Sequence, residues 1–157
     1  MKPNVICHPS PNFKLEPNRA ISCLVLHATE TSSLSSPLSW LCDPKSQVSA
    51  HYLIDIDGTI YQLVDDRHTA WHAGKSEWDG IPGVNHFSIG IEMVNLNDGK
   101  MPYPEPQVAA CADLVKFLVE TYKVSLHDIV RHADIAPGRK NDPLGFDMEG
   151  FKRRLIV

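Results

Sequence analysis

The segment ISCLVLH at residues 21–27 predicts a buried β-strand, because apolar side chains run through its middle. On the two-residue period of a strand, Cys23, Val25 and His27 share one face. His27 is the last residue of the segment, where the chain leaves its sheet and can present a side chain to a cleft. We therefore expect His27 at one end of a central sheet, in a position suited to chemistry.

A second strand is predicted at residues 88–94, SIGIEMV. Its apolar side chains alternate with Ser88, Gly90 and Glu92, so these three residues share the opposite face. Ser88 and Gly90 are small, which leaves room for a substrate above the Glu92 carboxylate. The pattern indicates core side chains on one face of the strand and a functional acid on the other.

The rest of the chain supplies further strands and helices around these two segments. Asp57-Gly58 is a strong hairpin signal between two strand-like runs, and Ser36-Pro37 is typical of a helix start with Ser36 as N-cap. We expect strands at residues 48–56, 59–64 and 129–132, and helices at residues 36–41, 108–122 and 146–154. This order predicts an α/β (α+β) fold, with a mixed central β-sheet flanked by helices.

The N-terminal region differs in character from the rest. Residues 1–20 carry four prolines and no apolar run, so we expect an irregular arm. Residues 21–157 then form a single domain, in which the polar, glycine-containing segment 65–87 is a long functional loop. A chain of this length predicts a folded accessible surface of roughly 7,900 Å² and a core that needs no disulfides. We expect a monomer.

Composition excludes several classes of function. The 157 residues are 43% hydrophobic and 22% charged, which is typical of a globular protein rather than a disordered one. A net charge of −4 at pH 7 gives no general attraction to nucleic acid, so we expect no nucleic-acid partner. No stretch approaches the roughly 18 consecutive apolar residues of a membrane span, so no transmembrane segment is expected.

Cysteine usage bears on the compartment. The four cysteines are widely spaced and form no C-x-x-C pair: Cys7, Cys23, Cys42 and Cys111. We expect four free thiols, which are typical of a reducing compartment. Residues 1–20 also lack the apolar stretch of a secretory signal. The cytoplasm is therefore the expected location, and a periplasmic or exported protein from which a leader has been removed is the alternative.

Two histidines and an aspartate suggest a metal site. His27 and His132 each end a predicted strand, and Asp142 follows His132 by ten residues. Two imidazoles and one carboxylate suit Zn²⁺ and leave a fourth tetrahedral position for water, as in catalytic sites. Each residue alone is explained as well by a structural hydrogen bond or a turn. Asp134, two residues from His132, competes with Asp142 as the carboxylate ligand.

Two further residues could act on a water held by such an ion. Glu92 could accept its proton and later hand that proton to a leaving amine. Lys140 lies two residues before Asp142, so its ammonium could stabilise the oxyanion of a tetrahedral intermediate. Together these side chains predict metal-assisted hydrolysis of an amide.

Five segments of the chain resemble the zinc-dependent N-acetylmuramoyl-L-alanine amidases of bacteria. In order, they are CLVLHATE (23–30), VSAHYLIDIDGTIYQLVDD (48–66), AWHAGKS (70–76), NHFSIGIEMVN (85–95) and RHADIAPGRKNDP (131–143). The fold of that family is shared with phage lysozyme-type amidases and animal peptidoglycan recognition proteins. The resemblance implies hydrolysis of the amide between N-acetylmuramic acid, or its anhydro form, and L-alanine of the peptidoglycan stem peptide.

The resemblance also implies roles for individual residues. It implies one zinc ion per chain, held by His27, His132 and Asp142. It implies Glu92 as the general base and Lys140 as the group that stabilises the transition state. The expected partner is therefore peptidoglycan or a muropeptide released from it.

The cleft beside the metal is less sharply defined. The phage branch has a tyrosine where this chain has Ala50, which places the acid and base work on Glu92. The candidate substrate contacts are Trp71, His72, His51 and Arg139. For His51, packing within the sheet or support of the site is the competing interpretation, and for Trp71 and His72 it is a contact at the rim.

Two other functions would use the same residues. A non-catalytic peptidoglycan-binding module of this fold would recognise murein without cutting it, although such modules typically lack a metal ligand. A purely structural zinc would normally have four protein ligands, often cysteines, and no cysteine lies near these three residues. The sequence leaves open whether intact murein or anhydro-muropeptides are preferred.

Overall fold

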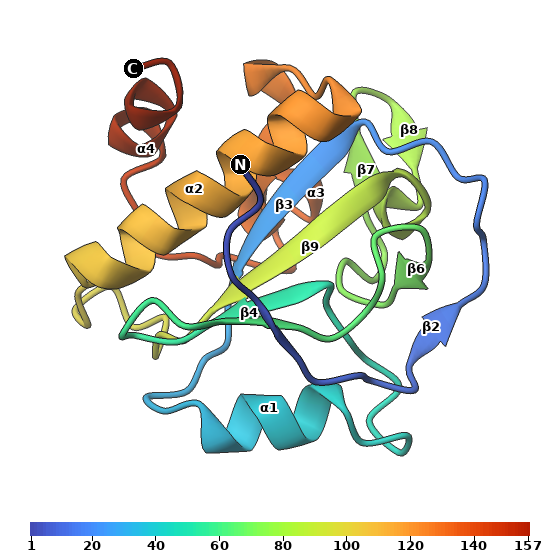
Figure 1. Cartoon of the computed structure of the whole chain (residues 1–157), viewed down its shortest axis with the longest axis horizontal. Helices are drawn as coiled ribbons and strands as arrows, with labels where there is room; N and C mark the ends of the chain where they lie inside the picture. Colours follow the sequence, from blue (N-terminus) through green and yellow to red (C-terminus); the bar gives the residue numbers. More distant parts are fainter.

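A six-stranded mixed sheet forms the centre of the computed structural model, which describes residues 1–157 (Figure 1). Across the sheet, the strands run β1 (Ile6–Cys7), β5 (Ile60–Gln62), β4 (Tyr52–Ile54), β9 (Ser88–Met93), β3 (Cys23–Ala28) and β10 (Ile129–Arg131). Only the β4–β5 pair is antiparallel, as expected for a hairpin around Asp57-Gly58. The predicted mixed sheet is therefore confirmed, and its parallel strands end at a common edge.

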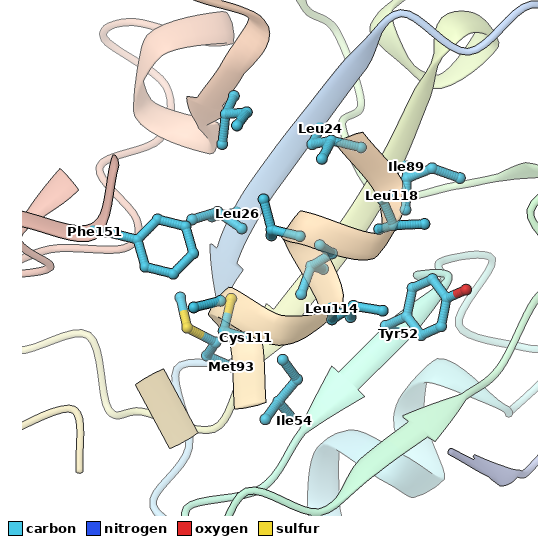
Figure 2. Close-up of a cluster of buried hydrophobic side chains, with 14 of the residues drawn as sticks. Leu24, Leu26, Tyr52, Ile54, Ile89, Met93, Cys111, Leu114, Leu118 and Phe151 are labelled. Carbon is cyan, nitrogen blue, oxygen red and sulfur yellow. The ribbon is translucent and has the colours of Figure 1, made fainter. Parts of the chain in front are cut away.

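One face of the sheet packs against two helices. Helix α2 (Glu105–Tyr122) lies on the sheet along β9 and β3, and α4 (Met148–Leu155) lies beside it (Figure 1). Figure 2 shows side chains from β3, β9 and α2 meeting in this layer, among them Leu26, Met93 and Leu114. A leucine-sized side chain that is fully buried contributes about 1.5–3 kcal/mol. This layer is the main core.

The other face of the sheet carries a smaller core and the polar residues. Cys23 and Val25 pack there against Val84 and Ile135, as the predicted strand period requires. Segment 65–87 covers this face with short elements: β6 (Thr69–Ala70), β7 (Glu77–Trp78), β8 (Ile81–Pro82) and the 3-10 helix η1 (Val84–Phe87). His27 and Glu92 lie beyond the apolar residues on the same face, at the end of their strands.

Several predicted boundaries are shifted. Helix α1 (Ser35–Leu41) begins after Leu34, so the prediction of Ser36 as N-cap is wrong, and Pro37 lies within the first turn. Helix α2 begins three residues before the predicted start. His132 does not end β10 but begins the short helix α3 (His132–Ile135), and the 3-10 helix η2 (Leu126–Asp128) precedes β10.

The N-terminal arm contains two short strands that its proline content did not predict. β1 pairs with β5 at the edge of the sheet, and β2 (Phe13–Lys14) pairs with β6. Ser10 and Asn12, which lie between them, are buried: Ser10 donates to the Leu41 carbonyl, and the Asn12 amide donates to the Asp43 and Val48 carbonyls. The arm therefore holds the segment that follows α1.

The global properties agree with the sequence. The accessible surface is 7,834 Å², close to the scaling expectation. All four cysteines are free, as predicted. None of the helices combines the length and apolar character that crossing a membrane would require.

Candidate active site

Three separate parts of the chain meet at the carboxyl end of the parallel strands. His27 on β3 lies directly opposite Glu92 on β9 in the ladder register. β10 runs parallel to β3 on its other side, so His132 emerges next to His27. The loop after α3 returns to the same edge and brings Asp142 with it, where the Ala28 N–H donates to its carboxylate at 3.2 Å. The parallel sheet is therefore what brings these distant residues together.

His27, His132 and Asp142 form a buried cluster that could hold a metal ion. The two Nδ1 atoms of His27 and His132 are 3.0 Å apart, and the Asp142 oxygens are 3.6 and 3.2 Å from them. Ligand atoms of a tetrahedral site with bonds of about 2.0–2.1 Å lie about 3.3 Å apart. The spacing of the three donors therefore fits one small cation.

Hydrogen bonding defines the tautomer of His132. Its Nε2 lies 3.1 Å from the Ala73 carbonyl oxygen, which can only accept, so Nε2 carries the proton. In the neutral imidazole, the Nδ1 that faces Asp142 and His27 is then the lone pair that can bind a metal. The donor chemistry of the cluster agrees with its spacing.

The electrostatics of the cluster agree with metal binding. Burial lowers the pKa of His27 to about 4, despite the neighbouring Asp142. Burial acts to raise the pKa of Asp142, but its close contacts with the His132 and His27 imidazoles outweigh that effect and hold the pKa well below its ordinary value. At neutral pH the cluster thus has neutral imidazole at His27 and an ionised carboxylate, the protonation states that ligands require.

Glu92 lies beside the cluster, and its pKa is shifted in the opposite direction to that of Asp142. Its Oε1 is 4.0 Å from His27 Nδ1, and its buried Oε2 has no hydrogen-bond partner. Burial, followed by the negative charges of Asp142 and Glu30, raises the pKa of Glu92 to about 8. A carboxylate with such a pKa and a free oxygen is suited to taking up and returning a proton near pH 7.

The cluster opens into a cavity of about 450 Å³, the size range of small-molecule sites. Lys140 and Arg139 line it, as does Trp71, three residues that the sequence had placed at the site. Trp40 and Glu30 also line it, and the sequence did not single them out. Trp40 lies on α1 with 57% of its surface exposed, and nothing in its local pattern shows that α1 forms a wall of the cleft.

The other predicted substrate contacts are His72, His51 and Arg139, and each of them is hydrogen-bonded to another part of the protein. His72 lines the cavity but is buried, with its Nδ1 2.9 Å from His27 Nε2. His51 does not line the cavity, and its Nδ1 accepts from the Gly90 N–H at 3.0 Å. Arg139 donates to the carbonyls of Ala73 and Lys75 at 2.6 and 2.9 Å. Of these three, only His72 and Arg139 border the space that a substrate could occupy.

The competition between the two aspartates is resolved by their partners. Asp134 forms an ion pair with Arg131 at 2.7 Å and accepts from the Arg131 N–H, so it closes the first turn of α3. Its carboxylate is therefore engaged on that turn. Asp142 is the carboxylate that faces both imidazoles.

Known amidases resemble this chain in sequence and in structure. The family model described as N-acetylmuramoyl-L-alanine amidase matches residues 17–145. The chain is 38% identical over 137 residues to N-acetylmuramoyl-L-alanine amidase AmiD of Escherichia coli, covering 78% of this chain and 49% of AmiD. It is 34% identical over 162 residues to 1,6-anhydro-N-acetylmuramyl-L-alanine amidase AmpD of Haemophilus influenzae, covering 90% and 87%.

Solved structures of amidases also resemble this chain. The structure of E. coli AmiD with the substrate anhydro-N-acetylmuramic acid-L-Ala-D-γ-Glu-L-Lys matches with a TM-score of 0.80 at 35% identity. The match covers 85% of this chain and 57% of that one. This chain thus spans about half the length of AmiD of E. coli and 87% of the length of AmpD of H. influenzae.

Proposed function

Because this chain belongs to the N-acetylmuramoyl-L-alanine amidase family, we propose that it hydrolyses the amide between N-acetylmuramic acid, or its anhydro form, and L-alanine of the stem peptide. The observation that carries the proposal is the meeting of His27, His132 and Asp142 beside Glu92, at the floor of one cavity. A module that only binds murein would need neither the three converging ligands nor a carboxylate with a free buried oxygen.

The resident ion in this proposal is zinc, one per chain, held by His27, His132 and Asp142. When bound, zinc polarises the amide carbonyl and lowers the pKa of a coordinated water to about 7. The three ligands carry a single negative charge between them, so the site keeps positive charge for the reaction.

Glu92 moves the proton in the proposed mechanism. Its Oε2 has no partner in the protein and can accept the proton of the attacking water. The same carboxyl group then donates this proton to the departing amine of L-alanine. Burial raises the pKa of Glu92, so the protonated acid that the second half of this transfer requires is accessible at neutral pH.

Lys140 stabilises negative charge in the proposed mechanism. It lines the cavity within the same loop as Asp142, and its ammonium can stabilise the negative charge that develops on the amide oxygen. Trp40 and Trp71 also line the cavity. We assign the sugar to these indoles and the acidic stem peptide to the side with Lys140 and Arg139.

The substrate class follows from the relatives. AmpD of H. influenzae is named for the 1,6-anhydro sugar, and the AmiD complex contains an anhydro-muropeptide. We propose a soluble muropeptide as the substrate and the cytoplasm as the compartment, since all four cysteines are free thiols.

Product analysis tests the proposal. The zinc-loaded protein is incubated with an anhydro-muropeptide, and the products are identified by mass spectrometry. We expect free stem peptide and free anhydro-N-acetylmuramic acid in equal amounts, and turnover reduced by about 10²–10⁴ with Glu92→Gln. Binding of the muropeptide without release of stem peptide would show a recognition module instead. A parallel incubation with insoluble sacculi shows whether intact murein is also cut.

A further inference from the structure

The imidazole of His72 lies in a closed slot behind His27. His72 Nδ1 is 2.9 Å from His27 Nε2, and His72 Nε2 is 2.9 Å from the Ser88 hydroxyl. Gly90 forms one wall of the slot, because a Cβ atom there would lie 2.4 Å from His72 Cγ. The ring is therefore held between a cluster ligand and a serine of β9, with no room for a side chain at residue 90.

The next residue contacts the second imidazole. The Ala73 carbonyl accepts from His132 Nε2 at 3.1 Å and from the Arg139 guanidinium at 2.6 Å. The Asn85 side-chain oxygen accepts from the backbone N–H groups of both His72 and Ala73, at 3.2 and 2.8 Å. Two adjacent residues of one loop thus contact both histidines of the cluster, and Asn85 and Arg139 hold them in place.

The hydrogen bond between His27 and His72 has two possible directions. If His27 Nε2 donates, the His27 Nδ1 that faces His132 and Asp142 is a free lone pair, and His72 Nε2 carries a proton toward Ser88. If His72 Nδ1 donates, His27 carries its proton on Nδ1, which points into the cluster and cannot bind an ion. The Ser88 hydroxyl can accept from His72 Nε2 in the first arrangement or donate to it in the second, but only the first leaves His27 Nδ1 free for a metal ion.

We propose that His72 and the Ala73 carbonyl are positioning groups that make both cluster histidines donate through Nε2, so that both present Nδ1 to one metal ion. Ser88 holds the other end of the His72 ring through the hydrogen bond to Nε2, although it does not contact the cluster. The inference rests on the metal site of the proposed function. It assigns His72 to orienting a ligand rather than to touching the substrate.

Zinc affinity tests the inference, measured by competition with a chromophoric chelator on the purified full chain. His72→Phe keeps a ring but removes both nitrogens, and we expect about 10- to 100-fold weaker zinc binding. His72→Asn restores an acceptor close to the place of Nδ1 and is expected to recover much of this loss. Ser88→Ala is expected to weaken zinc binding as well, by less than His72→Phe.

A matched variant separates positioning from general destabilisation. Ser10 is also buried and also hydrogen-bonded, to the Leu41 carbonyl, but lies in the N-terminal arm. Ser10→Ala should lower thermal stability and leave zinc affinity unchanged. Equal zinc affinity in wild type, His72→Phe and Ser88→Ala would overturn the inference and leave the proposed function standing. A wild-type chain that binds no zinc would overturn both.

A spectroscopic measurement reports on the tautomers directly. Nitrogen-15 NMR of the imidazoles in the zinc-loaded protein should show protonated Nε2 on His27, His72 and His132. A zinc-loaded protein in which His72 is protonated on Nδ1 would contradict the proposal, whatever the affinities are.

Discussion

Replacing Gly90 with alanine is expected to weaken zinc binding, although Gly90 contacts none of the three proposed ligands. The added Cβ would lie 2.4, 2.6 and 2.7 Å from the Cγ, Cδ2 and Nδ1 atoms of His72, all too close for non-bonded atoms. His72 must therefore move away from β9, and the 2.9 Å contact between its Nδ1 and His27 Nε2 is lost. Gly90 is in a strand with ordinary φ, so the effect comes from the methyl group itself.

The size of the effect follows from two contributions. Overpacking of a buried site costs about 1–3 kcal/mol, and each kcal/mol lowers the Tm of a chain of this length by about 2–4 °C. Loss of the group that orients a metal-bound histidine weakens metal affinity by about 10- to 100-fold. The zinc-loaded form should therefore lose more stability than the metal-free form.

Thermal unfolding with and without zinc, together with chelator competition, measures both contributions. Gly80→Ala is the matched control, because Gly80 lies in the β7–β8 turn with φ +78°, has no atom within 4 Å of an added Cβ and does not line the cavity. It should lower stability by about 1–2 kcal/mol through backbone strain and leave zinc affinity unchanged. If Gly90→Ala binds zinc as tightly as wild type, the role given to His72 is refuted.

Three other perturbations report on different parts of the site. His132→Ala should abolish stoichiometric zinc in metal analysis of the purified protein, and a variant that retains one zinc per chain would remove His132 from the ligand set. Trp40→Ala should raise KM with little change in kcat or zinc content; covering roughly 40 Å² of indole contributes about 1 kcal/mol, which corresponds to about a fivefold rise in KM. An unchanged KM would remove Trp40 from the sugar site. Burial lowers the pKa of His51 to about 3 in the folded chain. Below the ordinary histidine pKa of 6.5, His51 therefore takes up a proton in the unfolded chain but not in the folded one. The stability that neutral His51 contributes is therefore complete above pH 6.5 and is lost as the pH falls toward 3. In denaturant titrations of the metal-free protein, the free energy of unfolding of His51→Asn should decline less steeply over this pH range than that of wild type. An equally steep decline in both proteins would exclude His51 as a source of the pH dependence.

The central sheet could be predicted because it depends on long, regular patterns. The strands of His27 and Glu92 each bury one apolar face, and parallel neighbours end at the same edge of a sheet. The two-residue strands of the arm were not predicted, since a strand of that length forms only where a partner such as β5 offers an open edge. The sequence of the arm does not indicate which strand it pairs with.

The finer features of the site depend on tertiary placement. Asp134 and Asp142 are chemically alike, and the ion pair of Asp134 with Arg131 separates their roles. Trp40 lines the cavity because α1 forms one of its walls, which no pattern within residues 35–41 indicates. The sequence placed His72 near the cleft, but its contact with His27 Nε2 depends on the slot that Gly90 leaves open.

The location of zinc in a crystal of the zinc-loaded protein tests the ligand set most directly. An anomalous difference map at the zinc edge should show one peak per chain, about 2.0–2.1 Å from Nδ1 of His27, from Nδ1 of His132 and from a carboxylate oxygen of Asp142. A peak bound through Nε2 of either histidine, or one at Asp134 or elsewhere on the chain, would contradict the proposed metal centre and the mechanism built on it.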